Sequence, residues 1–257
     1  MTARGYGVAG ALDRKLVAAL ASHAESAGYR TFWANDTENG DGLDALRVAV
    51  STTSVIRFGV GVIPIDRVSA AEIAERVKRY DLPEDRLTIG IGSGGLKAGA
   101  LAAVERGARD LKRLTAARIV LGGLGPKMVA LAVEEADGVL LNWLTPEYAA
   151  AQVSARRQSN PAAWLAAYVR VGLTGGGADR VLEEGARYAG YPAYGAHFKR
   201  MGVKPEATSA YGDAGAVHAT LARFDASGVD ESIVRAVAAT ETLDDYLAVL
   251  NAAAPNG

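Results

Sequence analysis

Residues 118–145 constrain the fold more than any other part of this chain of 257 residues. They read as an apolar strand, a glycine turn, a short helix opened by Pro126, and a second apolar strand. Neither strand alternates polar with apolar residues, which indicates a parallel sheet buried on both faces. A chain built from such units is an α/β protein.

Strand-like and helix-like segments alternate along the rest of the chain in the same way. Ser69, Thr145 and Thr242 have the character of helix caps. Beyond the two strands of segment 118–145, strands are predicted at residues 4–9, 29–34, 56–63, 87–92, 164–173 and 232–237. Eight strand–helix units favour a closed (β/α)8 TIM barrel over an open sheet, and we expect one domain over residues 1–257.

One stretch departs from the repeating unit. Between the predicted seventh and eighth strands, at about residues 172–231, the pattern indicates two or three helices instead of one. Because this helical insertion follows the end of a strand, we expect it over the carboxyl face of the barrel, where barrel active sites are built.

Composition argues against several classes of function. The 28 basic and 29 acidic residues nearly balance and form no basic face, so no nucleic-acid partner is expected. There is no cysteine for disulfides or thiolate chemistry, and the three histidines lack metal-ligand spacing, so no metal site is predicted. No apolar run could span a membrane and no signal peptide is recognisable, so we expect a cytoplasmic protein.

Residues 122–127, Gly-Gly-Leu-Gly-Pro-Lys, are the main candidate for ligand binding. Pro126 as the first helical residue, after Gly123 and Gly125, directs free N–H groups and the helix dipole at one point beside Lys127. An anion, most simply a phosphate, fits such a point. A plain helix start is the alternative.

Residues that follow other strands should face the same side of the barrel. Segment 35–37 (Asn-Asp-Thr) is either a turn or a source of a carboxylate for a ligand. The glycines of segment 59–64 indicate either tight packing or a ligand close to the backbone. The glycines of segment 90–95 form a flexible turn or leave room for a planar ring. The acid that a Rossmann site needs is absent, so that interpretation is rejected.

Two further places carry candidate side chains. Asn142 and Trp143 end the sixth strand, where the tryptophan is either a core residue or the wall of a site for a flat ligand, with Asn142 donating to it. Tyr194 and His197 of the insertion are candidate proton donors, with packing or solvation as the alternative.

In their order and spacing, these motifs resemble the luciferase-like monooxygenase family of (β/α)8 proteins, and within it the branch that uses coenzyme F420. The motifs lie at residues 32–36, 58–64, 87–94, 122–127, 136–140 and 191–202. The resemblance implies a bacterial-luciferase-like barrel with a cofactor across its carboxyl face and a deazaflavin ring near strands two to four. It also implies a homodimer and a small-molecule substrate.

The resemblance further implies roles for single residues. Asp36 would contact the deazaflavin head, a non-proline cis peptide at Gly61–Val62 would back the ring, and the phosphate would lie at the glycine turn. The expected catalytic residues are Asp36, Thr37, Tyr194 and His197. The expected cofactor-binding residues are Asp36, Gly61, Val62, Ile63, Gly92, Ser93, Gly123, Gly125, Pro126, Lys127, Asn142 and Trp143.

Three functions remain open from the sequence. The leading one is an F420-dependent oxidoreductase that moves a hydride between the deazaflavin and a small organic substrate. The second is a monooxygenase that uses FMN. The third is a cofactor-binding protein without catalysis, favoured by Thr37 and Gly95, where some relatives carry a histidine and a glutamate. A threonine hydroxyl is a poor general acid near pH 7.

Overall fold

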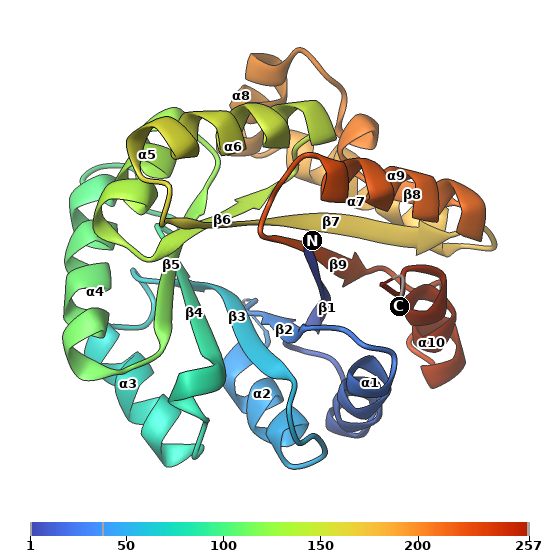
Figure 1. Cartoon of the computed structure of the whole chain (residues 1–257), viewed down its shortest axis with the longest axis horizontal. Helices are drawn as coiled ribbons and strands as arrows, with labels where there is room; N and C mark the ends of the chain where they lie inside the picture. Colours follow the sequence, from blue (N-terminus) through green and yellow to red (C-terminus); the bar gives the residue numbers. More distant parts are fainter. Residues whose placement is uncertain (1, 38, 256–257) are drawn as a thin grey trace.

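Eight parallel strands close into a barrel in the computed structural model, which describes residues 2–37 and 39–255 (Figure 1). Each strand pairs with its two neighbours in the ring, and the ring is completed where β7 pairs with both β6 and β9. The barrel strands are β1 (Ala3–Ala9), β2 (Thr31–Asn35), β3 (Arg57–Pro64), β4 (Leu87–Gly92), β5 (Arg118–Gly123), β6 (Gly138–Asn142), β7 (Trp164–Leu173) and β9 (Glu231–Ala236). The predicted TIM barrel is confirmed.

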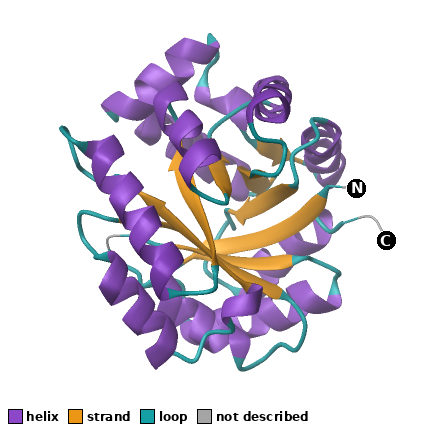
Figure 2. Cartoon of the chain, turned by 60° about the vertical axis from the view of Figure 1, so that its left-hand side comes forward, coloured by secondary structure: helices purple, strands orange, loops and turns teal. Residues whose placement is uncertain are grey.

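Helices enclose the strands on the outside (Figure 2). They are α1 (Arg14–Ser26), α2 (Gly42–Val50), α3 (Ala70–Arg79), α4 (Ala100–Leu114), α5 (Pro126–Glu135), α6 (Pro146–Ser159), α7 (Gly177–Ala189), α8 (Pro192–Met201), α9 (Ala214–Ala226) and α10 (Leu243–Ala252), with short 3-10 turns η1 (Glu84–Arg86) and η2 (Pro205–Thr208). The predicted caps Ser69, Thr145 and Thr242 each accept a hydrogen bond from a backbone N–H of the first turn.

The segment between β7 and β9 holds α7, α8 and α9, as the sequence pattern indicates, and one strand that it does not reveal. This strand, β8 (Ala210–Gly212), pairs with β7 at Val171–Leu173, past the end of β6. Three residues are too few for a recognisable period, so the sequence gives no sign of β8.

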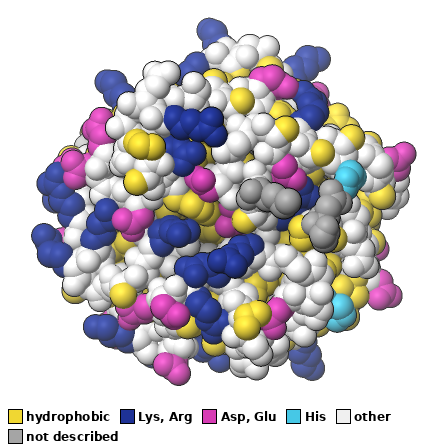
Figure 3. All heavy atoms as spheres, in the orientation of Figure 1, with side chains coloured by type: hydrophobic (Ala, Val, Ile, Leu, Met, Phe, Trp, Pro, Cys, Tyr) yellow, Lys and Arg dark blue, Asp and Glu magenta, His cyan; other side chains and the backbone are white. Residues whose placement is uncertain are grey.

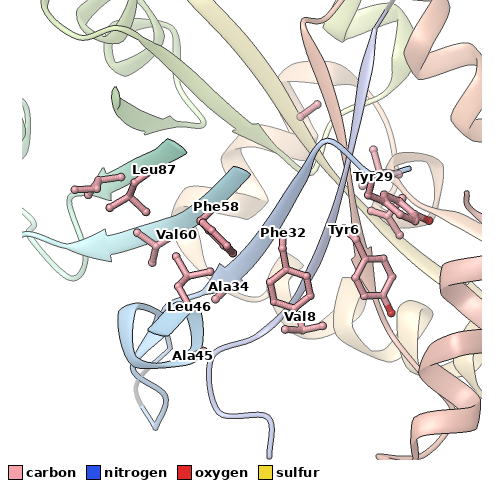
Figure 4. Packing of buried hydrophobic residues seen from close by; sticks show 14 of the residues in the cluster. Tyr6, Val8, Tyr29, Phe32, Ala34, Ala45, Leu46, Phe58, Val60 and Leu87 are labelled. Carbon is pink, nitrogen blue, oxygen red and sulfur yellow. The ribbon is translucent and has the colours of Figure 1, made fainter. Parts of the chain in front are cut away.

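The strands separate two apolar cores. The larger one lies between the strands and the helices, and Figure 4 shows part of it, with Tyr6, Phe32 and Phe58 on neighbouring strands. The smaller one fills the inside of the barrel and consists of Trp33, Val120, Leu140, Ala166, Tyr168 and Ile233. Tyr168 is the last residue of this inner core along β7. The side chains that follow it on the same face of β7 therefore lie at the carboxyl end of the barrel.

The amino end of the barrel holds a buried carboxyl group. Glu231 accepts hydrogen bonds from Trp33 Nε1 at 2.8 Å and from the Thr31 hydroxyl at 3.3 Å. Burial raises the pKa of Glu231 to about 7, although these bonds and the charges of Arg118 and Arg57 act against it. The protonated and the charged form of this carboxyl group are therefore both populated near neutral pH.

Acidic and basic side chains are interspersed around the edge of the face drawn in Figure 3, with several Lys and Arg side chains near its middle. Within residues 2–37 and 39–255, none of the helices combines the length and the apolar character that a membrane crossing requires.

Candidate functional site

A cavity of about 340 Å³ opens at the carboxyl ends of the strands. The last residues of β2 to β6 line it, and α7 and α8 contribute side chains from the insertion. The lining residues are Asn35, Asp36, Thr37, Gly61, Val62, Pro64, Gly92, Ser93, Gly94, Gly122, Gly123, Leu124, Leu140, Asn142, Tyr168, Arg170, Glu184, Tyr188, Ala193, Tyr194 and Arg235. The cavity thus lies at the end of the barrel where the sequence predicts a site.

One wall of the cavity is the irregular end of β3. The Gly61–Val62 peptide bond is cis, as expected from the motif, and the pairing of β3 with β4 shifts register between Val60 and Ile63. Asn35 Nδ2 donates a hydrogen bond of 2.9 Å to the Gly61 carbonyl oxygen. Ile63 is buried in the outer core and does not line the cavity.

Glycines leave this wall without protruding side chains, and we call it the low glycine wall. A Cβ atom at Gly61 would lie 2.6 Å from Leu140 Cδ2, and one at Gly92 would lie 2.9 Å from Val62 Cγ2. At Gly122 it would lie 3.0 Å from Val62 Cγ1. The Val62 side chain therefore lies across the glycines of β4 and β5, and their missing side chains leave a shallow apolar surface.

Asp36 is held at the corner formed by β2 and α2. Its Oδ2 accepts from the Gly42 N–H at 3.2 Å, and its Oδ1 pairs with Arg67 at 2.9 Å. Burial raises the pKa of Asp36, and the Gly42 N–H and the Arg67 charge oppose that rise. Asp36 is thus anchored at the cavity edge and is easier to protonate than an exposed aspartate.

Three buried polar atoms that belong to cavity-lining side chains have no hydrogen-bond partner among the described residues: Asn35 Oδ1, Thr37 Oγ1 and Tyr168 OH. A buried polar atom without a partner costs about 1–3 kcal/mol, so such groups normally have a protein, water or ligand partner. Their position around one cavity fits a polar ligand.

The opposite wall is built on a buried arginine of β7. Arg170 Nε pairs with Glu184 of α7 at 3.2 Å, its NH1 donates to Asn142 Oδ1, and its guanidinium lies 3.9 Å from the centre of the Trp143 ring. Burial favours the neutral form of Glu184, but the charges of Arg170, Arg235 and Arg187 and the hydrogen bond from Arg170 together outweigh it and lower the pKa of Glu184. The ion pair fastens α7 over the barrel.

Tyrosines of the insertion cover the cavity from above. Tyr188 and Tyr194 both line it, with their ring centres 4.7 Å apart in an edge-to-face arrangement. Burial raises the pKa of Tyr194 to about 12, so its hydroxyl keeps its proton at neutral pH. Tyr194 is therefore placed as a hydrogen-bond donor to whatever the cavity holds.

The structure does not bring His197 to the cavity. Its Nε2 lies 2.8 Å from the Trp143 carbonyl oxygen, and Arg200 donates to its Nδ1 at 3.3 Å. Burial lowers the pKa of His197, and this pattern of partners fits a neutral ring with the proton on Nε2. His197 thus holds the backbone of Trp143, which has a left-handed φ of 53° and is itself buried beneath the cavity lining.

The glycine turn after β5 is only partly in the cavity. Gly122, Gly123 and Leu124 line it, whereas Gly125, Pro126 and Lys127 do not, and the Lys127 side chain is exposed. Pro126 is the first residue of α5, as predicted. Arg200, from α8, donates to the Leu124 carbonyl oxygen at 3.3 Å and brings a second cation to this turn.

The other predicted residues also lie partly inside and partly outside the cavity lining. Ser93 and Asn142 line the cavity, and Trp143 does not. Sequence reasoning missed Asn35 as an anchor of β3 and missed Tyr168, Arg170 and Arg235 as lining residues. An arginine inside an otherwise apolar strand was the available signal for the last two, because charged residues are rarely buried without a partner.

Comparison with known proteins supports the resemblance drawn from the motifs. The family model described as luciferase-like monooxygenase matches residues 2–101, from β1 to the start of α4. None of the curated protein sequences matches the chain significantly.

Solved structures with the same fold cover nearly the whole chain. The coenzyme F420 dependent tetrahydromethanopterin reductase from Methanopyrus kandleri is 18% identical with a TM-score of 0.73, over 96% of this chain and 97% of that one. An F420-dependent secondary alcohol dehydrogenase, solved with an F420–acetone adduct, is 13% identical with a TM-score of 0.72, over 98% and 99%. The oxygenating constituent of 3,6-diketocamphane monooxygenase from Pseudomonas putida, solved with FMN, is 12% identical with a TM-score of 0.65, over 94% and 92%. At such identities the likeness establishes the fold, and the similar structures include proteins of both cofactor types.

Proposed function

From this resemblance to luciferase-like monooxygenases, we propose that the chain is an F420-dependent oxidoreductase that transfers a hydride between the deazaflavin and a small organic substrate. The observation that carries the proposal is the cavity at the carboxyl end, with its low glycine wall and its three partnerless polar atoms. A planar, polar cofactor ring matches both features, because it needs a flat apolar support and hydrogen-bond partners at its edge.

The residues of β2 and β3 suit the ring. Gly61, Val62 and Gly92 would support its face, while Asn35 Oδ1 and Thr37 Oγ1 would meet polar atoms at its edge. When bound, the deazaflavin supplies the carbon that accepts or gives the hydride, and the protein supplies position and surroundings.

The turn between β5 and α5 suits the phosphate. Gly125 caps α5 without a side-chain hydrogen bond, Pro126 has no N–H, and the Met128 N–H donates to the Gly125 carbonyl oxygen. The Lys127 N–H has no acceptor among the described residues and is left for an anion. Lys127 and Arg200 lie at this turn as exposed cations, and Asn142 stands on the neighbouring strand. The helix dipole and these charges favour the same sign of ligand.

The chain's own part in the reaction is to hold protons and exclude water. Tyr188 and Tyr194 would cover the reacting groups, and the Tyr194 hydroxyl, still protonated at neutral pH, would donate to a substrate oxygen. Asp36, whose pKa burial raises, is the carboxyl group best placed to exchange a proton at the β2 corner.

Parallel titrations with oxidised F420 and with FMN, followed by fluorescence quenching, test the proposal. We expect the tighter binding with F420, and no oxygen uptake when the reduced cofactor is added with an acceptor. Tighter binding of FMN with oxygen uptake would favour the monooxygenase, a possibility supported by the likeness to the FMN-containing structure. Binding of F420 without oxidation of the reduced form by any acceptor would favour a protein without catalysis.

A further inference from the structure

A second arginine at the barrel mouth forms no ion pair in the described part of the chain. Arg235 is the penultimate residue of β9 and lines the cavity. In the register of the barrel it is the direct partner of Arg170 on β7, so the two guanidinium groups stand on neighbouring strands at the same level. Arg170 has Glu184 as its partner, whereas Arg235 has no carboxylate within ion-pair distance among residues 2–37 and 39–255.

The hydrogen-bond capacity of Arg235 is also mostly unused. In the described part of the chain its one hydrogen bond goes from NH1 to the Ala236 carbonyl oxygen, and a guanidinium has five N–H groups to donate. The residue opposite it on β1 is Gly7, which has no side chain to cover it. The remaining donors of Arg235 therefore face the cavity or solvent.

A second donor, without a partner among the described residues, lines the same cavity. Tyr168, two residues before Arg170 on the same face of β7, has a buried hydroxyl without a partner and lines the same cavity. A Cβ atom at Gly7, the residue opposite Arg235, would lie 3.3 Å from Tyr168 Cε1, so one edge of the ring lies beside Gly7. The hydroxyl lies toward β3, because a Cβ atom at Gly61 would be 3.1 Å from it. The positive charge of Arg235 acts on the Tyr168 hydroxyl, although burial keeps the pKa of that group raised.

Neither of the two acids that line the cavity forms an ion pair with Arg235, although its charge also acts on Glu184. Glu184 is paired with Arg170, and Asp36 is paired with Arg67 at the β2 corner. One positive charge is therefore left over on the β7–β9 side of the cavity. A guanidinium fork with free donors matches the geometry of a carboxylate.

This charge is also far from the turn assigned to the cofactor phosphate. In the ring of strands, β9 is separated from β5 by β6 and β7 on one side and by β1 to β4 on the other. One cofactor anion at the β5–α5 turn would leave Arg235 for another ligand.

We propose that Arg235 binds the carboxylate of the substrate, so that the substrate class is a small organic acid in its anionic form. The proposal rests on the proposed function for the identity of the cavity as the active site. The binding of a carboxylate can nevertheless be measured without any turnover.

Calorimetric titrations of the wild-type protein test it first, with acetate, crotonate and cinnamate, each beside its neutral amide. These acids share one charged group and differ in size, so the result does not depend on one shape. We expect at least one acid to bind about tenfold or more tightly than its amide, the gain of a hydrogen-bonded charge pair. If all three acids bind no more tightly than their amides, the proposal is overturned.

Variants then locate the effect. Arg235→Gln should abolish the preference for the acid, and Arg235→Lys should retain part of it. Arg106→Gln, which removes an exposed charge on α4, should behave as the wild type. Glu184→Gln, which removes the nearest negative charge, should strengthen binding of the acid. It provides a second measurement if Arg235→Gln does not fold. An acid affinity unchanged in Arg235→Gln or in Glu184→Gln contradicts the proposal.

Titration of the same variants with F420 separates the two proposals. We expect Arg235→Gln to bind F420 as the wild type does, and a large loss of F420 affinity would assign Arg235 to the cofactor and overturn the inference. If the wild type prefers acids but does not bind F420, the proposed function fails and the carboxylate site stands. If it binds F420 without preferring acids, the proposed function stands and the carboxylate site fails.

Discussion

Replacing Glu231 by glutamine should make the stability of the barrel less dependent on pH. The carboxyl group lies inside the amino end of the barrel, and its pKa rises from 4.5 to about 7 mainly because burial disfavours the charged form. Glutamine has the same shape, and its Oε1 can still accept from Trp33 Nε1, which lies 2.8 Å from the native carboxylate.

The sign follows from proton uptake. Between about pH 4.5 and pH 7 the folded protein holds a proton on Glu231 that the unfolded chain has already released. The free energy of unfolding therefore falls as pH rises through this window and is fully reduced above the folded pKa. A shift of this size corresponds to about 3 kcal/mol, since each pKa unit is worth 1.36 kcal/mol.

Urea unfolding at pH 5 and pH 8 measures the effect. We expect Glu231→Gln and the wild type to have similar free energies of unfolding at pH 5, and the variant to be more stable by up to about 3 kcal/mol at pH 8. Glu134→Gln, an exposed glutamate on α5, serves as the matched control and should show no such difference. A variant that is less stable than the wild type at both pH values to the same extent would refute the reasoning, because burial of the charge would then not be the dominant cost.

Three further substitutions test the site. His197→Phe should lower the free energy of unfolding by about 1–3 kcal/mol in urea, because the Trp143 carbonyl loses its buried partner, while F420 affinity stays close to that of the wild type. Equal loss of affinity and activity in this variant would instead give His197 a role in the cavity. Glu184→Gln should destabilise the protein by about 1–3 kcal/mol, since Arg170 stays buried with a neutral partner, and an unchanged melting temperature would contradict the role assigned to that ion pair. Tyr194→Phe should lower kcat about 100-fold with little change in F420 affinity if its hydroxyl donates to the substrate, and an unchanged kcat would remove it from that role.

The barrel and its helices could be predicted because their signals are local. The apolar strands, the capping residues Ser69 and Thr145, and Pro126 at the start of α5 are each readable within a few residues of sequence. The cis bond at Gly61–Val62 was anticipated from the resemblance, since its motif extends over neighbouring positions of one strand.

The opposite side of the cavity could not be predicted in the same way. The proximity of Arg170 and Arg235 depends on the register between β7 and β9, which are 58 residues or more apart in the chain, and the pairing with Glu184 depends on how α7 docks. Tyr168 looked like one more apolar strand residue, and only the closed barrel shows that its hydroxyl reaches the cavity. Such contacts come from tertiary packing, which a single sequence does not encode locally.

The central claim is that a planar cofactor lies against the glycine wall of the cavity, and Gly92→Ala tests it most directly. The added Cβ would lie 2.9 Å from Val62 Cγ2 and would push this side chain toward the space assigned to the ring. Fluorescence titration should show that Gly92→Ala binds F420 at least about tenfold more weakly than the wild type does. Gly215→Ala, on α9 and away from the cavity, should bind as the wild type does. Equal F420 affinity in Gly92→Ala and the wild type would contradict the account, because the cofactor would then not rest on this wall.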